Sequence, residues 1–595
     1  MEFRALSVRA PTGAPILRGG SGVVPSGSLC AVIGPSGAGK STLLRAFCGR
    51  QALAGGSVHW DTRGRVVFLP QTDHLFDELT VSETVRFAVL LRTALRGADA
   101  RAHAASAVAA AGLGAVQHTR VGSVSGGERR RLGCALELLT NPAVLLLDEP
   151  LSGLDAVRAR GLVDWLAALC ARGRTVLLSV HQPTARMMRA FDCLLLLAQD
   201  GTVVYCGPTA GARAALRIEP DPRAALAEVL LEHLCCPDPP APAPEWPPAP
   251  VSERQASTGA GGGAPRRAKP APASFWYLLK RERLLAARRS VRGTSPALQA
   301  AAFALAVGLA FGHLSAAPHD GLLQRLSLAV TLVVSIGFMD LAAVSPFLRG
   351  RQTFLHEAWS GVFGAGRFVA AHFLAGLPVL LQQASIVALV VSRMTGHPPG
   401  EWLLVAVLLL LGMCSRSMAF LVGAACSKDA AALRLLPVLQ VLLLLFSGLF
   451  VPRTQLPHGL AWVAYASPAA HAFSLLLTAQ LQTLCAQITC VDDFGDPAPD
   501  WGNDALLRSN LTLPVSGATH VAAMLAFAAA GLSAAVAALH LRAHGPGCAQ
   551  HRSACRKRSQ CAHHGGDFGT PPPEGLGDLR QTHARHPEPA VHAGV

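Results

Sequence analysis

Charged side chains are scarce in this sequence, and their scarcity argues against a wholly soluble protein. They make up 15% of the 595 residues, whereas hydrophobic residues make up 51%. This balance favours a membrane protein. The apolar content is uneven, because residues 1–235 mix charged and apolar runs while long apolar segments fill residues 295–541. For a chain of this length, the pattern predicts at least two domains.

Three other features are missing from the first part of the chain. Its N-terminal residues contain no apolar core of the signal-peptide type, so we expect the first domain to remain in the cytosol. Its cysteines show no zinc-type spacing, which fits a reducing compartment. It lacks a basic face interleaved with aromatic residues, so we expect no nucleic-acid partner. We assign the net charge of +15 mostly to loops at the cytosolic face of a membrane.

Short apolar runs alternate with helical patterns through residues 1–235 and predict an α/β domain. The runs expected as buried strands are SLCAVIG, AVLLLDEP, RTVLLSV and CLLLLAQDGTVVYCG. Residues 236–272 are rich in proline, alanine and glycine and predict a linker without a core. Residues 273–294 predict an amphipathic connecting helix at the membrane interface. A solvated charged helix is the weaker alternative, because a spanning segment follows at once.

Six apolar segments are long enough to cross a membrane at roughly 20 residues per crossing, so residues 295–542 predict an all-α six-helix transmembrane domain. The segments are 295–315, 322–345, 368–392, 402–425, 431–452 and 519–541. The connecting loops at 346–367 and 426–430 are basic, and the long loop before the last segment is acidic. The positive-inside tendency then places the first domain and both termini in the cytosol.

The outer loop and the C-terminal tail carry further expectations. Asn510 begins a glycosylation triplet on the outer side, and Cys485 and Cys490 are expected to form a disulfide within or between chains. Residues 543–595 predict a disordered cytosolic tail. Palmitoylation of its cysteines and metal binding by its cysteines and histidines are the alternatives.

Residues 34–41, GPSGAGKS, match the phosphate-loop pattern after a predicted strand and before a predicted helix. Glycines let backbone amides converge on phosphate oxygens at a helix N-terminus, where the helix dipole favours anions. Lys40 is expected to reach the β- and γ-phosphates, and the Ser41 hydroxyl to bind Mg²⁺. The predicted nucleotide-binding residues of this loop are Gly34, Pro35, Ser36, Gly37, Ala38, Gly39, Lys40, Ser41 and Thr42.

Four polar side chains end apolar strands or follow them directly. Asp148 is predicted to hold Mg²⁺ together with Ser41 and Gln71, and Glu149 to act as the general base on the attacking water. Gln71 and His181 each follow an apolar strand and are expected to reach the γ-phosphate. Buried, satisfied core groups are the alternative for these two, but polar residues at the ends of successive strands favour a site.

Residues 123–139, SVSGGERRRLGCALELL, add a Ser-Gly-Gly loop that opens a basic helix. The phosphate loop, Gln71, VSGGE, LLLDEPLSGLD and HQP together resemble the nucleotide domains of ATP-binding-cassette (ABC) transporters in order and spacing. The details resemble the G subfamily, the White and sterol-transporter group, over residues 15–542. One departure is that no aromatic residue lies between Phe3 and Gly34 to stack on adenine. The resemblance assigns nucleotide contacts to Asp155 and, in the site of an opposing domain, to Ser125, Gly126, Gly127 and Glu128.

The resemblance implies a half-transporter that couples ATP hydrolysis in a dimer to export of a lipid, sterol or other hydrophobic substrate. It implies ATP and Mg²⁺ as cofactors, and a multi-pass location among the lipids of the plasma membrane or an endomembrane. A homodimer is the simpler expectation, and a heterodimer with a related half-transporter remains open. A soluble ABC ATPase acting on ribosomes or DNA is disfavoured by the six apolar segments. A non-catalytic partner subunit or ATP-gated regulator is disfavoured by the full set of catalytic positions.

Polar residues within apolar segments are costly and therefore indicate functional positions. Asp340 and Arg416 are predicted to pair and hold two helices together, unless Asp340 simply lies near the interface. His356 and Glu357 lie where the resemblance places a contact with the nucleotide domain, and solvated loop charges are the alternative. Residues expected to line an internal cavity are Gln382, Gln383 and Gln440.

Overall fold

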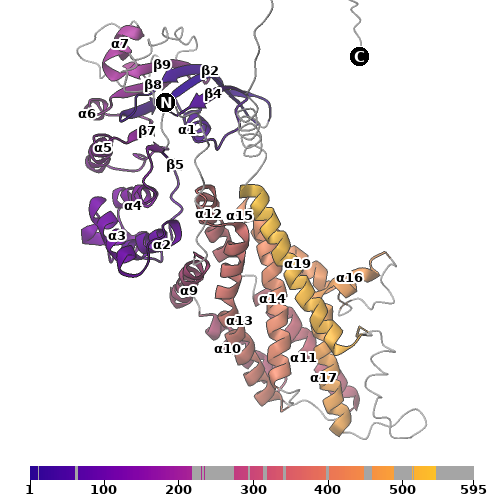
Figure 1. Ribbon diagram of the computed structural model, residues 1–595. Coiled ribbons are helices and arrows are strands. Elements are labelled where there is room, and N and C mark those ends of the chain that lie inside the picture. The colour runs from indigo at the N-terminus through magenta and orange to yellow at the C-terminus, as the bar shows by residue number, and fades with distance from the viewer. Residues whose placement is uncertain are drawn as a thin grey trace, which may run out of the picture.

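The structure is a computed structural model, and the part of the chain that it describes contains an α/β domain beside a group of long helices (Figure 1). The described residues are 1–10, 12–60, 64–216, 229–230, 234, 274–292, 295–312, 318–339, 343–396, 401–445, 447, 450, 459–487, 512–513 and 515–543. The linker 236–272, the tail after residue 543, Asp340, Cys490 and Asn510 lie outside them, so the expectations about these positions stay predictions.

A six-stranded sheet forms the centre of the α/β domain, in the order β5-β6-β7-β3-β8-β9. Its strands are β3 (Leu29–Ile33), β5 (Val66–Leu69), β6 (Val144–Leu147), β7 (Thr175–Val180), β8 (Cys193–Leu197) and β9 (Val203–Pro208). All neighbours pair in parallel except β9, which forms a hairpin with β8. The predicted strands are confirmed, and their nearly unbroken apolar sequences fit a parallel sheet that is covered on both faces.

Apolar layers cover the two faces of this sheet. Side chains of α5 (Ala156–Cys170) form one core with the sheet, and side chains of α1 (Lys40–Phe47) form another. A three-stranded antiparallel sheet closes the second core and contains β1 (Glu2–Arg9), β2 (Pro15–Val23) and β4 (Gly55–His59). Because parallel strands expose their carboxyl ends at one edge, the residues that follow β3, β5, β6 and β7 meet there.

Three helices form a smaller unit with its own core beside the sheet. They are α2 (Val81–Arg92), α3 (Gly97–Ala110) and α4 (Gly126–Leu138). Capping boxes define where two of them begin: Thr80 with Glu83 opens α2, and Ser125 with Glu128 opens α4. The Ser-Gly-Gly loop is therefore the N-terminal cap of α4.

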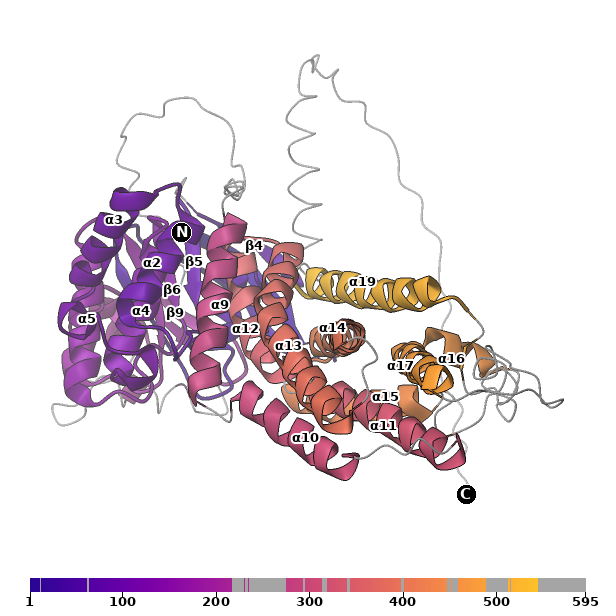
Figure 2. The ribbon, with the colours of Figure 1, turned by 90° about the horizontal axis from the view of Figure 1, so that it is seen from below.

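Long helices make up the second domain. They are α9 (Ser274–Arg292), α10 (Pro296–Ala310), α11 (Pro318–Met339), α12 (Val344–Trp359), α13 (Ala365–Thr395), α14 (Glu401–Ala425), α15 (Asp429–Leu445), α16 (Ala461–Ala466), α17 (Pro468–Gln487) and α19 (Gly517–Ala543). The helix α14 contacts α11, α12, α13, α15, α17 and α19. Viewed from below, α9 lies between the α/β domain and α13 (Figure 2).

Helices occupy all six places where spans were predicted, but not all of them are long. Helices long and apolar enough to cross a membrane lie within Leu323–Trp359, Ala365–Thr395, Glu401–Ala425 and Gly517–Ala543, and Pro296–Ala310 is a shorter apolar helix. For α10 and α15 the crossing stays a prediction.

Two segments expected as loops are helical. The basic loop 346–367 is largely the helix α12, and part of the long loop before the last segment forms α16 and α17. The helix α17 is not a solvated loop, because Phe473, Leu476 and Leu477 are buried in the same apolar core as α11 and α14. These expectations were wrong because the contacts that bury the two segments are made with residues far away in the sequence.

Candidate nucleotide-binding site

The phosphate loop lies between β3 and α1, at the centre of the sheet. Gly39, which directly precedes α1, has a φ of 93°, a conformation that side chains other than glycine rarely adopt. A Cβ added at Gly34 would lie 2.5 Å from the carbonyl oxygen of Leu197. Glycine is therefore required at both positions, and the loop leads directly into the N-terminus of a helix, as anion binding requires.

Lys40 is the first residue of α1 and is buried. Its Nζ donates to the carbonyl oxygens of Gly34 and Pro35 at 2.7 and 2.8 Å, so the ammonium group lies against the phosphate loop. Burial lowers the pKa of Lys40, while the charges of Glu149 and Asp148 act in the opposite direction. The cation is thus held beside the loop where it was predicted to meet phosphate.

Ser41 and Asp148 meet at the edge of the sheet. Ser41 Oγ donates to Asp148 Oδ1 at 2.8 Å, and Ser179 Oγ donates to the same oxygen at 2.9 Å. Ser179 also accepts the backbone amide of Glu149 at 2.7 Å and is fully buried. A hydroxyl beside a carboxylate is a donor set of the kind that Mg²⁺ uses, so the residues present fit this ion.

Glu149 is in contact with the two other predicted site residues. Gln71 Nε2 donates to Glu149 Oε2 at 2.6 Å, and His181 Nε2 lies 3.0 Å from Glu149 Oε1. Glu149 has a φ of 44°, which is strained for a residue with a side chain, and such strain clusters at functional sites. Gln71 and His181 are both exposed, so the alternative that they are buried core groups is wrong.

The Ser125 loop is directed elsewhere on the surface. The Ser125 amide donates to Glu128 Oε2 at 2.8 Å, which completes the cap of α4. Ser125, Gly127 and Glu128 line a surface pocket together with Arg158 of α5, whose N-cap is Asp155. Within the described part of the chain, no residue of the phosphate loop lines this pocket. The structure thus unites Lys40, Ser41, Gln71, Asp148, Glu149 and His181, but it does not bring the Ser125 loop or Asp155 to them.

Two residues that support the site were missed in the sequence. Ser179 is one, and in the sequence it is visible only as a hydroxyl residue near the end of the otherwise apolar run VLLSV of β7. Arg130 is the other: it donates to the carbonyl oxygens of Pro70 and Gln71 and pairs with Asp73 at 2.8 Å. Because Arg130 lies in the helix that Ser125 begins, it ties that helix to the segment carrying Gln71. In the sequence, only its place in a run of basic residues distinguished Arg130.

Comparisons with known proteins identify both domains. A family model for the ABC transporter matches residues 17–152, and one for the ABC-2 type transporter matches residues 273–481. ABC transporter G family member 25 of Arabidopsis thaliana is 30% identical over 529 residues, covering 78% of this chain and 77% of that relative. This chain belongs to the G family of ABC transporters.

Other members of the G family match mainly one part of the chain. Members 22 and 5 of Arabidopsis thaliana are 38% and 41% identical, and the alignments cover 33% and 29% of this chain and 28% and 29% of those relatives. A solved ATP-binding cassette of an ABC transporter aligns with 36% of the chain at 21% identity, with a TM-score of 0.33, too low to carry an argument. This G-family chain is an ATPase whose ATP binding is coupled to transport across a membrane.

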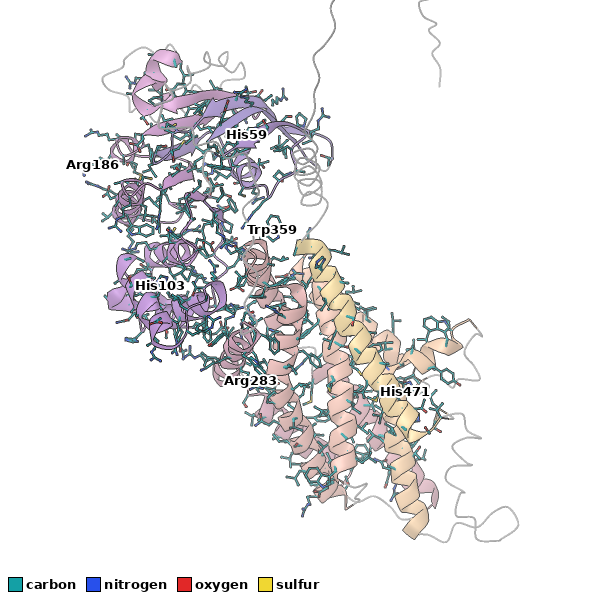
Figure 3. The ribbon with its side chains drawn as sticks, in the orientation of Figure 1. His59, His103, Arg186, Arg283, Trp359 and His471 are labelled. Atoms are coloured by element: carbon teal, nitrogen blue, oxygen red, sulfur yellow. The ribbon has the colours of Figure 1, made fainter. Side chains whose placement is uncertain are left out.

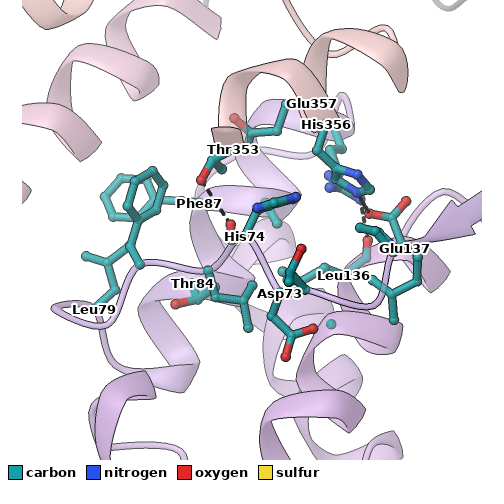
Figure 4. Close-up of a pocket in the computed structure, with 18 of the residues that line it drawn as sticks. Asp73, His74, Leu79, Thr84, Phe87, Leu136, Glu137, Thr353, His356 and Glu357 are labelled. Carbon is teal, nitrogen blue, oxygen red and sulfur yellow. Dashed lines mark hydrogen bonds and ion pairs between the residues drawn. The ribbon is translucent and has the colours of Figure 1, made fainter. Parts of the chain in front are cut away.

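In this transporter the helix α12 docks directly on the nucleotide-binding domain (Figure 4). His356 Nε2 lies 3.0 Å from Glu137 Oε1, and Thr353 Oγ1 donates to the carbonyl oxygen of His74 at 3.0 Å. Trp359, at the end of the same helix, lies under the guanidinium of Arg50, 5.1 Å from the ring centroid (Figure 3). A small cavity of about 60 Å³ remains between the two domains. His356 therefore contacts the nucleotide-binding domain and is not a solvated loop charge.

The connecting helix α9 is a second bridge between the domains. Arg281 is fully buried and pairs with Glu357 through two hydrogen bonds of 2.7 and 3.1 Å. Arg288 holds Glu83 in the same bidentate manner, at 2.6 and 2.7 Å, so it binds the cap of α2. The solvated alternatives for this helix and for Glu357 are therefore wrong, since Arg281 and Glu357 are buried and paired between α9 and α12, and Arg288 is paired across the two domains.

The predictions for polar residues within the membrane helices have mixed outcomes. Arg416 is buried on α14, but its predicted partner Asp340 lies outside the described residues. Gln383 is buried and lines a cavity, whereas Gln382 is exposed, so the cavity prediction for Gln382 was wrong. Gln440 is buried, and its side chain lies against Gly337 of α11.

Proposed function

We propose that this G-family transporter is a half-transporter that exports a lipid, sterol or other hydrophobic substrate, driven by ATP hydrolysis in a dimer. The observation that carries the proposal is the separation of Ser125, Gly127 and Glu128 from the phosphate loop of the same chain. A γ-phosphate held at Lys40 would need donors on its open side. The Ser125 loop of a second copy has the required chemistry, because it combines a hydroxyl with amides at a helix N-terminus.

We assign Mg²⁺ to Ser41, Gln71 and Asp148, and the bound ion would neutralise charge on the nucleotide phosphates. Within this site, Ser179 orients Asp148, and Lys40 holds the phosphate loop. Glu149 would accept the proton of the attacking water, and Gln71 and His181 orient its carboxylate from either side. The strained backbone at Glu149 fixes the direction of that side chain.

Coupling of hydrolysis to transport follows from differential binding. ATP that bridges two chains binds the closed dimer better than the open one, and this difference in affinity biases the membrane helices. Glu137, His74 and Glu83 transmit the movement because they contact α12 and α9 directly. The closed dimer would face outward, and hydrolysis would return the helices to the inward-facing state.

The membrane helices present an apolar outer surface, as contact with lipid requires. Large apolar side chains are exposed along α10, α13 and α15, among them Leu309, Leu381 and Val438. We place the nucleotide-binding domain in the cytosol, where ATP is available, and the opposite ends of the membrane helices outside. The partner is a second G-type half-transporter, most simply another copy of this chain.

The test is to purify the chain alone in lipid and measure ATP turnover against a panel of sterols, phospholipids and hydrophobic drugs. We expect basal turnover, and stimulation by at least one lipid-like compound. Stimulation only by water-soluble compounds would contradict the hydrophobic cargo. No turnover in a correctly folded sample would contradict the homodimer and support the alternative of a non-catalytic or obligately heterodimeric subunit.

A further inference from the structure

Arg50 lies where the end of α1 meets the end of α12, and its guanidinium contacts two aromatic rings. It is 5.1 Å from the ring centroid of Trp359 on α12 and 5.1 Å from that of Phe68 on β5. In Figure 3, Trp359 lies where α12 meets the α/β domain. A cation over an aromatic face is attracted by the ring, and more strongly where water is excluded. One guanidinium therefore joins a helix and a strand of the ATP site to a helix of the membrane domain.

The backbone fixes Arg50 to the end of α1. Gly49 has a φ of 71°, and its amide donates to the carbonyl oxygen of Ala46 at 3.0 Å. The Arg50 amide donates to the carbonyl oxygen of Arg45 at 2.8 Å. These two bonds are the pair that ends a helix in a Schellman motif, which favours glycine in the left-handed conformation. Since α1 has only eight residues, about 12 Å, it links Lys40 at its start rigidly to Arg50.

The end of α12 that carries Trp359 is fixed in the same way. Gly361 has a φ of 75°, and its amide donates to the carbonyl oxygen of Ala358 at 3.0 Å. The Val362 amide donates to the carbonyl oxygen of Glu357 at 3.0 Å. Val362 is also buried in the apolar core that α12 shares with α13. Trp359 therefore belongs to the membrane domain and has a defined place at its end.

Phe68 connects the same guanidinium to the catalytic side of the ATP site. This residue is only 3% exposed and lies on β5, the strand that precedes Gln71. Gln71 in turn donates to Glu149 at 2.6 Å. Arg50 thus contacts the strand that leads to Gln71 as well as α12, and its own backbone continues from the helix that begins at the phosphate loop.

We infer that Arg50 and Trp359 are positioning residues that carry the effect of ATP binding from α1 directly to α12. Phosphate that engages Lys40 shifts α1, and Arg50 shifts with it. The contact between Arg50 and Trp359 then differs in energy between the ATP-bound and ATP-free states, and such a difference is what biases α12. This route is separate from the contact of His356 with Glu137, which starts from α4. It rests on the coupling proposed above, but on neither the exported substrate nor the dimer.

The experiment measures hydrogen–deuterium exchange by mass spectrometry on the full chain in lipid nanodiscs, with and without Mg²⁺ and the non-hydrolysable analogue β,γ-imido-ATP. In wild type we expect the analogue to protect the phosphate loop and to change the protection of residues 353–362. Trp359→Leu and Arg50→Met should keep the protection of the phosphate loop but reduce the change in α12 by roughly 2- to 30-fold, the range of one cation–π contact. A merely structural role would not remove this response while nucleotide binding stays intact.

Three further variants separate the contact from general effects of charge or size. Arg45→Met is the matched control, because Arg45 is an exposed cation on the same helix, and it should leave the response of α12 unchanged. Trp359→Phe keeps an aromatic face and should retain most of the response. Combining Arg50→Met with Trp359→Leu should cause no larger loss than either alone, since both remove one contact.

Four outcomes would overturn the inference. A response of α12 that is unchanged in both Arg50→Met and Trp359→Leu would exclude this route and leave the coupling to His356 and Glu137. Equal loss in Arg45→Met would assign the effect to the charge of α1 rather than to the contact. Additive losses in the double variant would show that the two residues act independently. An α12 that does not respond to the analogue in wild type would exclude both this route and the proposed coupling.

Discussion

His356 Nε2 lies 3.0 Å from Glu137 Oε1, and this contact joins a membrane-domain helix to the helix that begins at Ser125. Glu137 also accepts a hydrogen bond from Arg92 at 2.9 Å. Although burial alone raises the pKa of Glu137, Arg92 and His356 outweigh it and hold the pKa well below its usual range. The Glu137 carboxylate at the junction is therefore charged. Through its contact with His356 it can transmit movement of α4 to α12.

Replacing His356 should uncouple the two domains without damaging the ATP site. We expect His356→Ala to keep ATP binding and basal turnover but to lose most of the stimulation by a transported compound. His356→Gln keeps a hydrogen-bond donor and should lose less. In a double-mutant cycle with Glu137→Gln, the coupling energy measured from stimulated turnover should lie within about 0.5–3 kcal/mol. Strictly additive effects would show that the 3.0 Å contact does not carry the coupling.

Ser179→Ala should weaken the ATP site by removing a buried hydroxyl that supports two of its residues. The hydroxyl bonds both Asp148 and the Glu149 amide, and its loss leaves a buried acceptor and donor unsatisfied. We expect a cost of about 1–3 kcal/mol in unfolding free energy and weaker Mg²⁺-dependent ATP binding, measured by thermal unfolding and nucleotide titration. Ser392→Ala is the matched control, because that buried hydroxyl makes no hydrogen bond within the described residues. A Ser179→Ala protein with unchanged Mg²⁺ dependence would contradict the positioning role.

Glu149→Gln should separate ATP binding from ATP turnover. The amide can keep the hydrogen-bonded contacts with Gln71 and His181, but it cannot accept the proton of water at neutral pH. We expect turnover to fall by roughly 10²–10⁴-fold with ATP affinity preserved, measured by phosphate release and nucleotide binding. Unchanged turnover would exclude Glu149 as the general base.

The junction should also weaken in mild acid. Burial, together with the neighbouring His356 and Arg50, lowers the pKa of His74 from 6.5 to about 4. Between these values the unfolded chain binds a proton that the folded chain does not, so stability falls as pH falls from 6.5 towards 4. The slope is at most about 1.4 kcal/mol per pH unit, reduced by partial solvent access. His74→Gln should flatten the dependence of the melting temperature on pH.

His103 provides the matched control for this pH effect. It is exposed on α3 (Figure 3), so His103→Gln should leave the profile unchanged. The backbone carbonyl of His74 still accepts from Thr353 in His74→Gln, which keeps that contact with α12. An identical acid dependence in wild type and His74→Gln would assign the effect to a group other than His74.

The ATP site could be predicted from the sequence because its parts are local. Each strand end, with Gln71, Asp148 and His181, follows an apolar run, and a parallel sheet brings such ends to one edge. The coupling contacts could not be predicted, because their partners are distant in sequence. Arg351 looked like a loop cation, yet it is buried in α12 and donates to the carbonyl oxygen of Cys426 and to Asp429. Only the fold shows that this charge is paired with groups beyond its own helix.

Complementation between two inactive chains should reveal the dimer. In our proposal, Lys40→Ala disables the phosphate side of both sites in a homodimer, and Ser125→Glu disables the opposing side of both. A mixed dimer of these two chains contains one site with both sides intact. We therefore expect each variant alone to lose ATP turnover, and co-expressed chains, purified through two different tags, to regain part of it. Recovery requires that Ser125 acts on the nucleotide of its partner, since a chain that used its own Ser125 loop would have no intact site in any combination. Mixed dimers without recovered turnover would contradict the shared site.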